Sequence, residues 1–273
     1  MAISILNNIP SLVAQNQLSI TQSNLQKTLF QLSSGSRINS GADDAAGLAI
    51  ADGLKANITA LTQSAQNASS GVGALQVADG SLAQVTTLLN RAVTLATEAS
   101  TGTVSNTQRT ALNAEYSQIQ NEINRIGTTA TYNGTSVFTS ASTSIFLSDA
   151  NSNSTIAVTV GLLASSGTGG LGLTTDITSE TNAQSALTQI DTAISTVAGT
   201  RGTIGAGINR LQAATNVITN QVQNLTSAQD GIVSADISQV VGNLSRYSIL
   251  SQTGISSLAQ ANSTQQNVLQ LLR

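Results

Sequence analysis

Very few residue types in this chain of 273 residues could carry out chemistry. Histidine and cysteine are both absent, so the chain lacks the commonest general base, the commonest metal ligand and any thiolate nucleophile. Two adjacent carboxylates, Asp43 and Asp44, stand just before an apolar helical pattern. A carboxylate at that place caps a helix and faces the positive end of its dipole, so we interpret Asp43 or Asp44 as the cap. No cluster of His, Cys or carboxylate residues supports acid–base or metal chemistry, and we predict no enzyme.

Three glycines could suggest a nucleotide site. Gly167, Gly169 and Gly172 match the dinucleotide-binding pattern G-x-G-x-x-G. A binding loop of that kind needs a helix with apolar spacing after its last glycine, and here the surroundings are rich in serine and threonine instead. We therefore interpret residues 165–172 as a flexible connector and expect no cofactor and no metal.

The composition excludes further classes of protein. Charged residues make up 8% of the chain and aromatic residues 2%, and the formal net charge is -3. The two lysines and eight arginines are scattered, so no basic run exists to bind nucleic acid. The sequence has no stretch of about 18 apolar residues, so it predicts no membrane span. The N-terminus lacks the basic start and longer apolar run of a secretory signal. A polar surface with so little charge lets copies of the chain approach each other closely.

Both ends of the chain carry an apolar residue at every seventh position. A repeat of seven keeps one seam of a helix facing a partner helix, so each end is predicted to contain a long rod. The front series is Leu54, Leu61, Ala68, Leu75, Leu82, Leu89 and Ala96, and the rear series is Ile190, Val197, Ile204, Leu211, Ile218, Leu225 and Ile232.

Outside each rod the sequence predicts a terminal helix, separated from the rod by a break at residues 35–41 or 234–236. Each terminal helix has one leucine stripe and little else to cover it, so the two need each other or neighbouring molecules. The stripe residues are Leu18, Leu25, Leu29, Leu32, Leu244, Leu258, Leu269 and Leu272.

The middle of the chain has a different pattern. A shorter amphipathic helix beginning near Asn106 should fold back on the long front helix. Residues 144–147 and 155–160 are strand-like and should pair through a turn at 149–154. The predicted fold is thus mainly α, a long antiparallel helical bundle or coiled coil with a small β-hairpin insertion at about 127–181. The predicted domains are 1–44 and 235–273, which form the two parts of an inner coiled coil, and 45–234, the bundle.

Three motifs in this order resemble bacterial flagellin. They are LSSGSRINSGADDAAGLAIA at 32–51, NLTSAQDGIVSADIS at 224–238 and the ending SSLAQANSTQQNVLQLLR at 256–273. The resemblance covers roughly residues 1–140 and 180–273, and it implies a D0/D1-like fold without large outer domains. It also implies a structural subunit that assembles with many copies of itself into the flagellar filament, used for motility, with its terminal helices lining a central channel.

The resemblance carries further expectations about partners and location. It implies export in an unfolded state by the flagellar type III route, with an export chaperone and cap and junction proteins as partners, and a final place in the extracellular flagellum. An alternative is a junction protein between hook and filament, built from similar terminal helices. Purified protein that polymerises alone into long filaments would favour the first function, and short caps or no polymer would favour the second.

A receptor site is also implied by the resemblance. Flagellins recognised by the innate receptor TLR5 use an arginine, a leucine and a glutamate, and the matching positions are Arg91, Leu95 and Glu115. The glutamate usual just before the leucine is Thr94 here. The alternative is that Arg91 and Glu115 form only a surface ion pair, worth about 0 to 1 kcal/mol.

Overall fold

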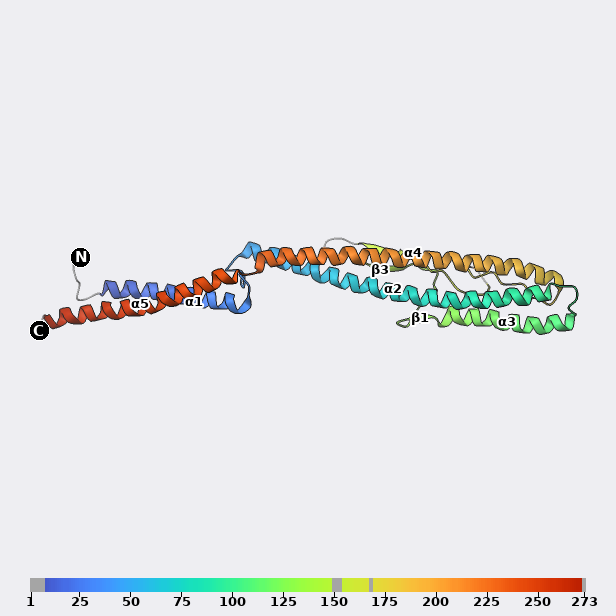
Figure 1. Cartoon of the computed structure of the whole chain (residues 1–273), viewed down its shortest axis with the longest axis horizontal. Coiled ribbons are helices and arrows are strands. Elements are labelled where there is room, and N and C mark those ends of the chain that lie inside the picture. Colours follow the sequence, from blue (N-terminus) through green and yellow to red (C-terminus); the bar gives the residue numbers. More distant parts are fainter. Residues whose placement is uncertain (1–7, 149–153, 167–168, 272–273) are drawn as a thin grey trace. The chain divides into compact units, whose positions relative to one another are not determined.

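The computed structural model describes residues 8–148, 154–166 and 169–271, and the side chains of these residues up to 267. The described helices are α1 (Ile9–Ser34), α2 (Ala45–Ala99), α3 (Asn106–Thr129), α4 (Glu180–Val233) and α5 (Ile237–Leu271) (Figure 1). Each lies within a few residues of its predicted place, so the prediction of a mainly helical protein is confirmed. The chain forms two compact units. We call the described parts of Met1–Lys55 and Leu225–Arg273 the terminal unit, and Ala56–Asn224 the central unit.

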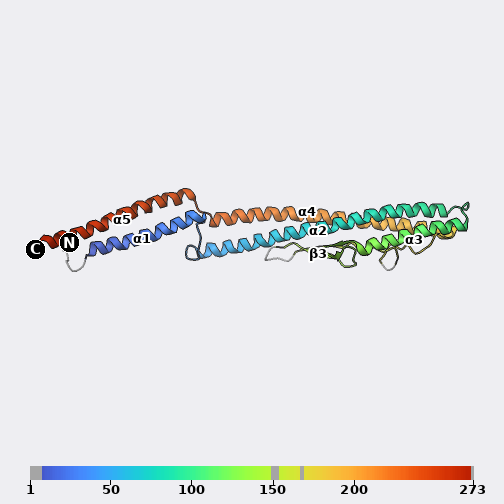
Figure 2. The ribbon, with the colours of Figure 1, turned by 90° about the horizontal axis from the view of Figure 1, so that it is seen from below.

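In the terminal unit, α1 and α5 pack side by side and antiparallel (Figure 1, Figure 2). The Asn8 side chain donates to the Ala261 carbonyl oxygen at 3.3 Å, near the free ends of the pair. Further along, a Cβ on Gly254 would lie 3.2 Å from Cδ1 of Leu18. Glycine at this position therefore lets the two helices approach closely.

The α1 side of this seam alternates leucine with threonine. Leu18, Leu25 and Leu32 are half-buried, and Thr21 and Thr28, between them, are buried. Both threonine hydroxyls donate to a carbonyl oxygen four residues earlier at 2.8 Å, so their hydrogen-bonding needs are met inside α1. The threonines can therefore take core positions of a coiled coil.

The predicted stripe differs from this seam at one position. Leu29 is 47% exposed, because Thr28 and not Leu29 continues the spacing of three and four residues. On α5 the seam passes through Val240, which is buried, and through Leu244 and Leu258, which are half-buried. The side chain of Leu269 and the whole of Leu272 lie outside the described residues.

In the central unit, α2 runs beside α4 and α3 (Figure 1, Figure 2). The heptad rows form its core as predicted. The buried members are Leu61, Ala68, Leu75, Leu82, Leu89 and Ala96 of α2 and Ile190, Val197, Ile204, Leu211 and Ile218 of α4. Gly71 lies beside Leu211, Leu75 beside Gly207 and Asp79 beside Arg201, so the α4 positions descend as the α2 positions rise and the two helices are antiparallel.

The turn from α2 to α3 is fixed by a buried arginine. Arg109 is 6% exposed, and its guanidinium donates to the carbonyl oxygens of Ala99 and Thr101, both at 2.8 Å, and to Oδ1 of Asn106 at 3.1 Å. A cation at the C-terminus of α2 satisfies carbonyls that have no partner within the helix. This clamp turns the chain back so that α3 packs on α2.

Two small hairpins follow α3. The predicted hairpin is confirmed: β3 (Thr143–Phe146) pairs antiparallel with β4 (Thr155–Val158). Its predicted turn lies mostly outside the described residues. A second pair, β1 (Thr131–Tyr132) with β2 (Thr135–Ser136), was not predicted. Its signal is the dipeptide between the strands, since Asn133 and Gly134 have φ of 50° and 78°, as a tight two-residue turn requires.

The segment between β4 and α4 is bound by amide side chains of α3. Asn124 accepts from the Ser165 N–H at 2.8 Å, Gln120 donates to the Leu173 carbonyl oxygen at 3.2 Å, and Asn113 accepts from the Ile177 N–H at 3.0 Å. Leu171 and Leu173 are buried. Of these hydrogen bonds, only that of Asn124 with Ser165 lies within the predicted flexible connector at 165–172, so the flexibility of that connector stays a prediction.

Candidate functional site

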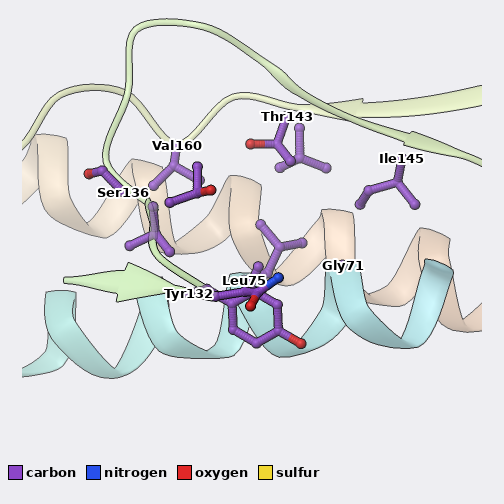
Figure 3. A pocket seen from close by; sticks show the side chains of 12 residues that line it. Gly71, Leu75, Tyr132, Ser136, Thr143, Ile145 and Val160 are labelled. Atoms are coloured by element: carbon purple, nitrogen blue, oxygen red, sulfur yellow. The ribbon is translucent and has the colours of Figure 1, made fainter. Parts of the chain in front are cut away.

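A cavity of about 250 Å³ lies in the central unit between α2 and the hairpin segments. Tyr132, Ile145 and Val160 line it together with Leu75 and Gly71 of α2 (Figure 3). Its lining contains no carboxylate, amine or guanidinium group. Across the described residues, no group of three or more carboxylates could hold a metal ion. Its walls are formed by α2 and by the hairpin segments that pack on it.

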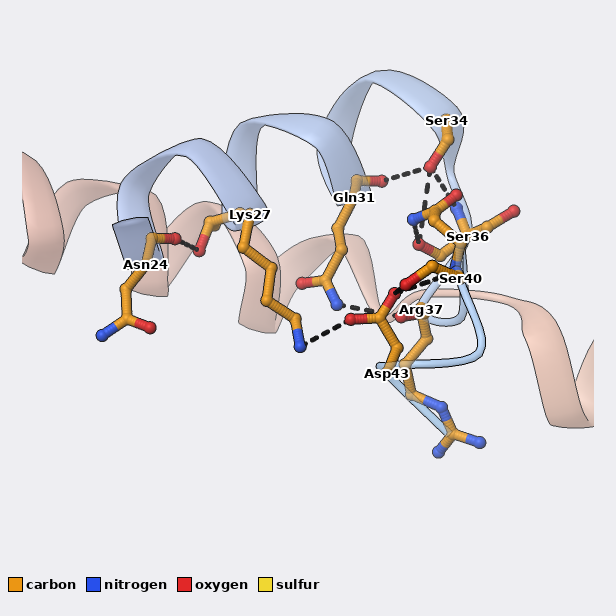
Figure 4. A network of polar contacts seen from close by, with 10 residues as sticks. Asn24, Lys27, Gln31, Ser34, Ser36, Arg37, Ser40 and Asp43 are labelled. Carbon is orange, nitrogen blue, oxygen red and sulfur yellow. Dashed lines mark hydrogen bonds and ion pairs between the residues drawn. The ribbon is translucent and has the colours of Figure 1, made fainter. Parts of the chain in front are cut away.

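The capping carboxylates have separate tasks at the start of α2. Oδ1 of Asp44 accepts from the Gly47 N–H at 2.9 Å, so Asp44 is the cap that the sequence predicts. Asp43 instead binds Lys27 of α1 at 2.7 Å and accepts from the N–H groups of Asn39 and Ser40, both at 3.1 Å (Figure 4). The hydrogen bonds from Lys27 and Asn39 lower the pKa of Asp43 from 3.8 to about 2.

The same loop is tied to the chain that leads into α5. Gly35 ends α1 with φ of 69°, and its carbonyl oxygen accepts from the Ala235 N–H at 3.0 Å. The guanidinium of Arg37 donates to the Ile232 carbonyl oxygen at 2.7 Å. Together with the ion pair of Lys27 and Asp43, these bonds fix the C-terminal end of α1 next to the N-terminal end of α5.

Exposed apolar side chains are concentrated on these two helices. Of the sixteen large apolar side chains exposed in the described part of the chain, eleven belong to α1 and α5. They are Ile9, Leu12, Val13, Ile20, Leu29 and Phe30 of α1 and Ile237, Val241, Ile249, Leu250 and Ile255 of α5. Burying them in a partner is favourable at about 1.5 to 3 kcal/mol each, before entropy is subtracted.

The outer faces of α1 and α5, opposite their shared seam, differ in character. At 100° per residue, the outer face of α1 contains Ile9, Leu12, Ile20 and Phe30, with Val13 at its edge. Polar residues stand between them on this face, namely Asn16, Ser19, Ser23, Gln26 and Lys27. The outer face of α5 contains Ser245, Gln252, Ser256 and Gln260, with Ile249 as an apolar exception. The outer face of α1 is therefore more apolar than that of α5 and better suited to burial in a partner.

The receptor candidates lie on α2 and α3, but only two reach the surface. Arg91 donates to both carboxylate oxygens of Glu115, at 2.7 and 2.9 Å, and both side chains are about half exposed. This hydrogen bond lowers the pKa of Glu115 and raises that of Arg91. Leu95 is only 1% exposed and packs in the core of the central unit. It cannot touch a partner while the unit keeps this fold.

The comparisons with known proteins agree with this architecture. Models of the bacterial flagellin N-terminal and C-terminal helical regions match residues 5–143 and 187–272. A flagellin of Halalkalibacterium halodurans is 36% identical over 268 residues, which is 98% of each chain. The flagellar filament 30.7 kDa core protein of Treponema maltophilum is 31% identical over 280 residues, 97% of this chain and 98% of its own. The crystal structure of Bacillus cereus flagellin, 28% identical, aligns with a TM-score of 0.50 over 60% of this chain and 94% of that one.

Proposed function

Because the chain belongs to the bacterial flagellin family, we propose that the apolar outer face of α1 is the surface that joins one subunit to the next. The family is structural and not enzymatic, and the chain is a subunit of the bacterial flagellar filament, a polymer of many copies outside the cell. No described helix has the length and apolar character needed to span a membrane.

The observation that carries this proposal is the contrast between the outer faces of α1 and α5. In a tube of α1·α5 pairs, the apolar face of α1 packs on neighbouring pairs, and the Ser/Gln face of α5 remains exposed to water. The polar face then lines a central channel, along which unfolded subunits move after export by the flagellar type III route. We include an export chaperone and the cap and junction proteins among its partners.

The test places a charge on each face in turn. Val13→Glu and Phe30→Glu, both at positions 63% exposed, put a carboxylate on the outer face of α1. We expect these variants to keep the helix content of the wild type, measured by circular dichroism, and to form no filaments in electron micrographs. The matched control is Gln252→Glu, an isosteric change on the exposed outer face of α5, which should still assemble.

Two results would contradict the proposal. Filaments of normal length from Val13→Glu and Phe30→Glu would move the contact away from α1, and loss of filaments in Gln252→Glu alone would reverse the two faces. Wild-type protein that forms only short caps, or no polymer, would favour a junction protein.

A second proposal concerns recognition by TLR5. Arg91 and Glu115 form an exposed, bidentate pair on the central unit and could dock a receptor directly, whereas Leu95 would only support the helix beneath them. We expect monomer carrying Arg91→Ala to lose at least tenfold in potency in a TLR5 reporter-cell assay, the loss of one strong contact. Arg125→Ala is the control, because Arg125 forms a similar exposed pair with Glu122 on α3. Equal potency of all three proteins, or no response to the wild type, would refute this proposal.

A further inference from the structure

The glycines in the long helices of the central unit fall into two groups. At Gly71, Gly73 and Gly207, an added Cβ would meet hairpin side chains. Those side chains are Ile145, Tyr132 and Val158 respectively. A second group has open space, with nothing within 4 Å of an added Cβ, and comprises Gly80 of α2 and Gly199, Gly202 and Gly205 of α4. Packing within the chain explains the first group and leaves the second unexplained.

The open glycines lie at one level of the bundle. Nε of Arg201 on α4 lies 2.8 Å from Oδ1 of Asp79 on α2, so these two positions face each other. Gly80 follows Asp79 directly, while Gly199 and Gly202 flank Arg201. Both long helices are therefore weakened at the same place, since a glycine in a helix interior is about fivefold less favourable than alanine in equilibrium terms.

The charged pair lies beside the apolar seam, which is continuous at this level: Leu75, Ala78 and Leu82 of α2 are all buried. Arg201 stands seven residues after Ile194 and seven before Ile208, and Asp79 stands seven after Val72. Both charged residues thus stand at the edge of the seam, in rows that elsewhere contain apolar residues and threonine, and their side chains are 38% and 39% exposed. An ion pair this exposed contributes little to the free energy of unfolding. The Asp79–Arg201 pair therefore acts mainly by fixing the register of α2 against α4.

Side-chain hydroxyls compete for helix carbonyl oxygens here, as they do at other levels of both helices, and at this level they coincide with the open glycines. The Ser81 hydroxyl donates to the Val77 carbonyl oxygen at 2.9 Å, across Gly80. On α4 the hydroxyls of Thr200 and Thr203 donate to carbonyl oxygens four residues earlier, at 3.0 and 3.2 Å. Such bonds compete for the helix carbonyls and bend helices, and Gly/Ser pairs are a recognised cause of kinks.

From these features we propose that residues 77–81 of α2 and 196–205 of α4 form a bending zone, where the central unit flexes without losing its register. The role of this zone rests on the proposed function. When a filament bends, subunits on one side are compressed and those on the other are extended. A zone of low bending stiffness in each subunit absorbs this change while the seams on either side stay packed.

Hydrogen exchange of the full-length monomer tests the zone without any need for assembly. We expect peptides covering 77–81 and 196–205 to be at least tenfold less protected, after correction for intrinsic rates, than the adjoining parts of α2 and α4. Replacing the four open glycines by alanine should slow local opening about fivefold for each glycine replaced. Equal protection of zone and flanks in the wild type would overturn the proposal.

Matched alanine variants separate bending from general stability. Gly53 and Gly231 are also helical glycines with open space, but they lie in the terminal unit. The double variant Gly53→Ala/Gly231→Ala should leave exchange in the zone unchanged. Gly207→Ala is a positive control, because its Cβ would lie within 2.9 Å of Val158. This variant should lower the urea midpoint of unfolding, as expected for a glycine that is packed against a neighbour.

The filament experiment then tests what the zone does. Filaments of the fourfold alanine variant should have a persistence length at least twice that of the wild type in electron micrographs, whereas Gly53→Ala/Gly231→Ala filaments should match the wild type. Unchanged stiffness of the fourfold variant would refute the role in filament bending. Failure of wild-type protein to form filaments would refute the proposed function instead, and the exchange result for the monomer would still stand.

Discussion

At the residue scale, the carboxylate of Asp43 makes the terminal unit sensitive to acid. Its pKa is lowered from 3.8 to about 2, mainly by the hydrogen bond from Lys27 and by that from the Asn39 N–H. A group whose pKa is lower in the folded state stabilises the fold while ionised, so its contribution is complete above 3.8 and is lost as the pH falls through about 2.

We therefore expect the thermal midpoint of the wild type to fall over this pH interval by more than that of Asp43→Asn, which cannot ionise there. Circular dichroism melts at a series of pH values measure both curves. Asp52→Asn, at an exposed position of α2, is the control and should follow the wild type. Parallel curves for wild type and Asp43→Asn would show that the hydrogen bonds to Asp43 do not couple to folding.

Arg109 illustrates a different dependence on a single side chain. Arg109→Ala leaves the carbonyl oxygens of Ala99 and Thr101 without this donor, and a buried unsatisfied group costs about 1 to 3 kcal/mol. We expect urea unfolding to show a loss of roughly 2 to 4 kcal/mol, with part of it recovered in Arg109→Lys, which keeps the charge but not the fork. Arg125→Ala removes only an exposed ion pair with Glu122 and should leave the urea midpoint close to that of the wild type.

At the element scale, the close approach of α5 to α1 depends on Gly254. A valine there would press on Leu18, because an added Cβ already lies 3.2 Å from that side chain. Gly242→Val is a matched control in the same helix, since nothing lies within 4 Å of its added Cβ. The change in helix propensity is the same in both, so the difference between them reports packing.

We expect Gly254→Val to weaken the α1·α5 pair by about 1 to 3 kcal/mol relative to Gly242→Val, and thus to raise the critical concentration for assembly about tenfold or more. Sedimentation of polymer against protein concentration gives this value. Equal critical concentrations would mean that the α1·α5 seam relaxes around the larger side chain.

The helices could be predicted from the sequence because their cores repeat every seven residues, as in the row from Leu61 to Ala96. The residues that fill each seam could not be predicted in the same way. Thr28 replaces Leu29 in the core because its hydroxyl is satisfied inside its own helix, and residue type alone does not reveal that. The backbone between β4 and α4 is bound by Asn113 and Asn124, far away in sequence. Burial of Leu95 was hidden by the motif match, which gives residue type and not orientation.

At the scale of the whole molecule, the division into two units predicts separate folding and assembly. The central unit buries its own leucine and isoleucine rows, whereas α1 and α5 leave eleven large apolar side chains exposed. Deletion of residues 1–35 or 240–273 should therefore abolish filaments and preserve a cooperative melt of the rest. Calorimetry and electron microscopy measure the two properties. Filaments of normal length from either truncated chain would contradict this division.

The low charge of the terminal helices predicts how assembly responds to salt. Within α1 the only charged residue is Lys27, which is paired with Asp43, and within α5 the only one is Arg246. Ions screen exposed charges strongly between about 0.05 and 0.5 M, but they leave the burial of apolar surface largely unchanged. If the outer face of α1 drives assembly, the critical concentration should change less than about threefold over that range.

Temperature should act more strongly than salt. Burial of apolar surface gives association a negative heat capacity change, so the enthalpy of assembly should become more negative on warming. Isothermal calorimetry of seeded growth at several temperatures measures that slope. The variants Val13→Glu and Phe30→Glu should grow from wild-type seeds weakly or not at all, and growth restored by salt would show that only charge repulsion had been introduced. A steep dependence of the wild type on salt would instead place the main contact on charged residues of the central unit, such as the Arg91–Glu115 pair.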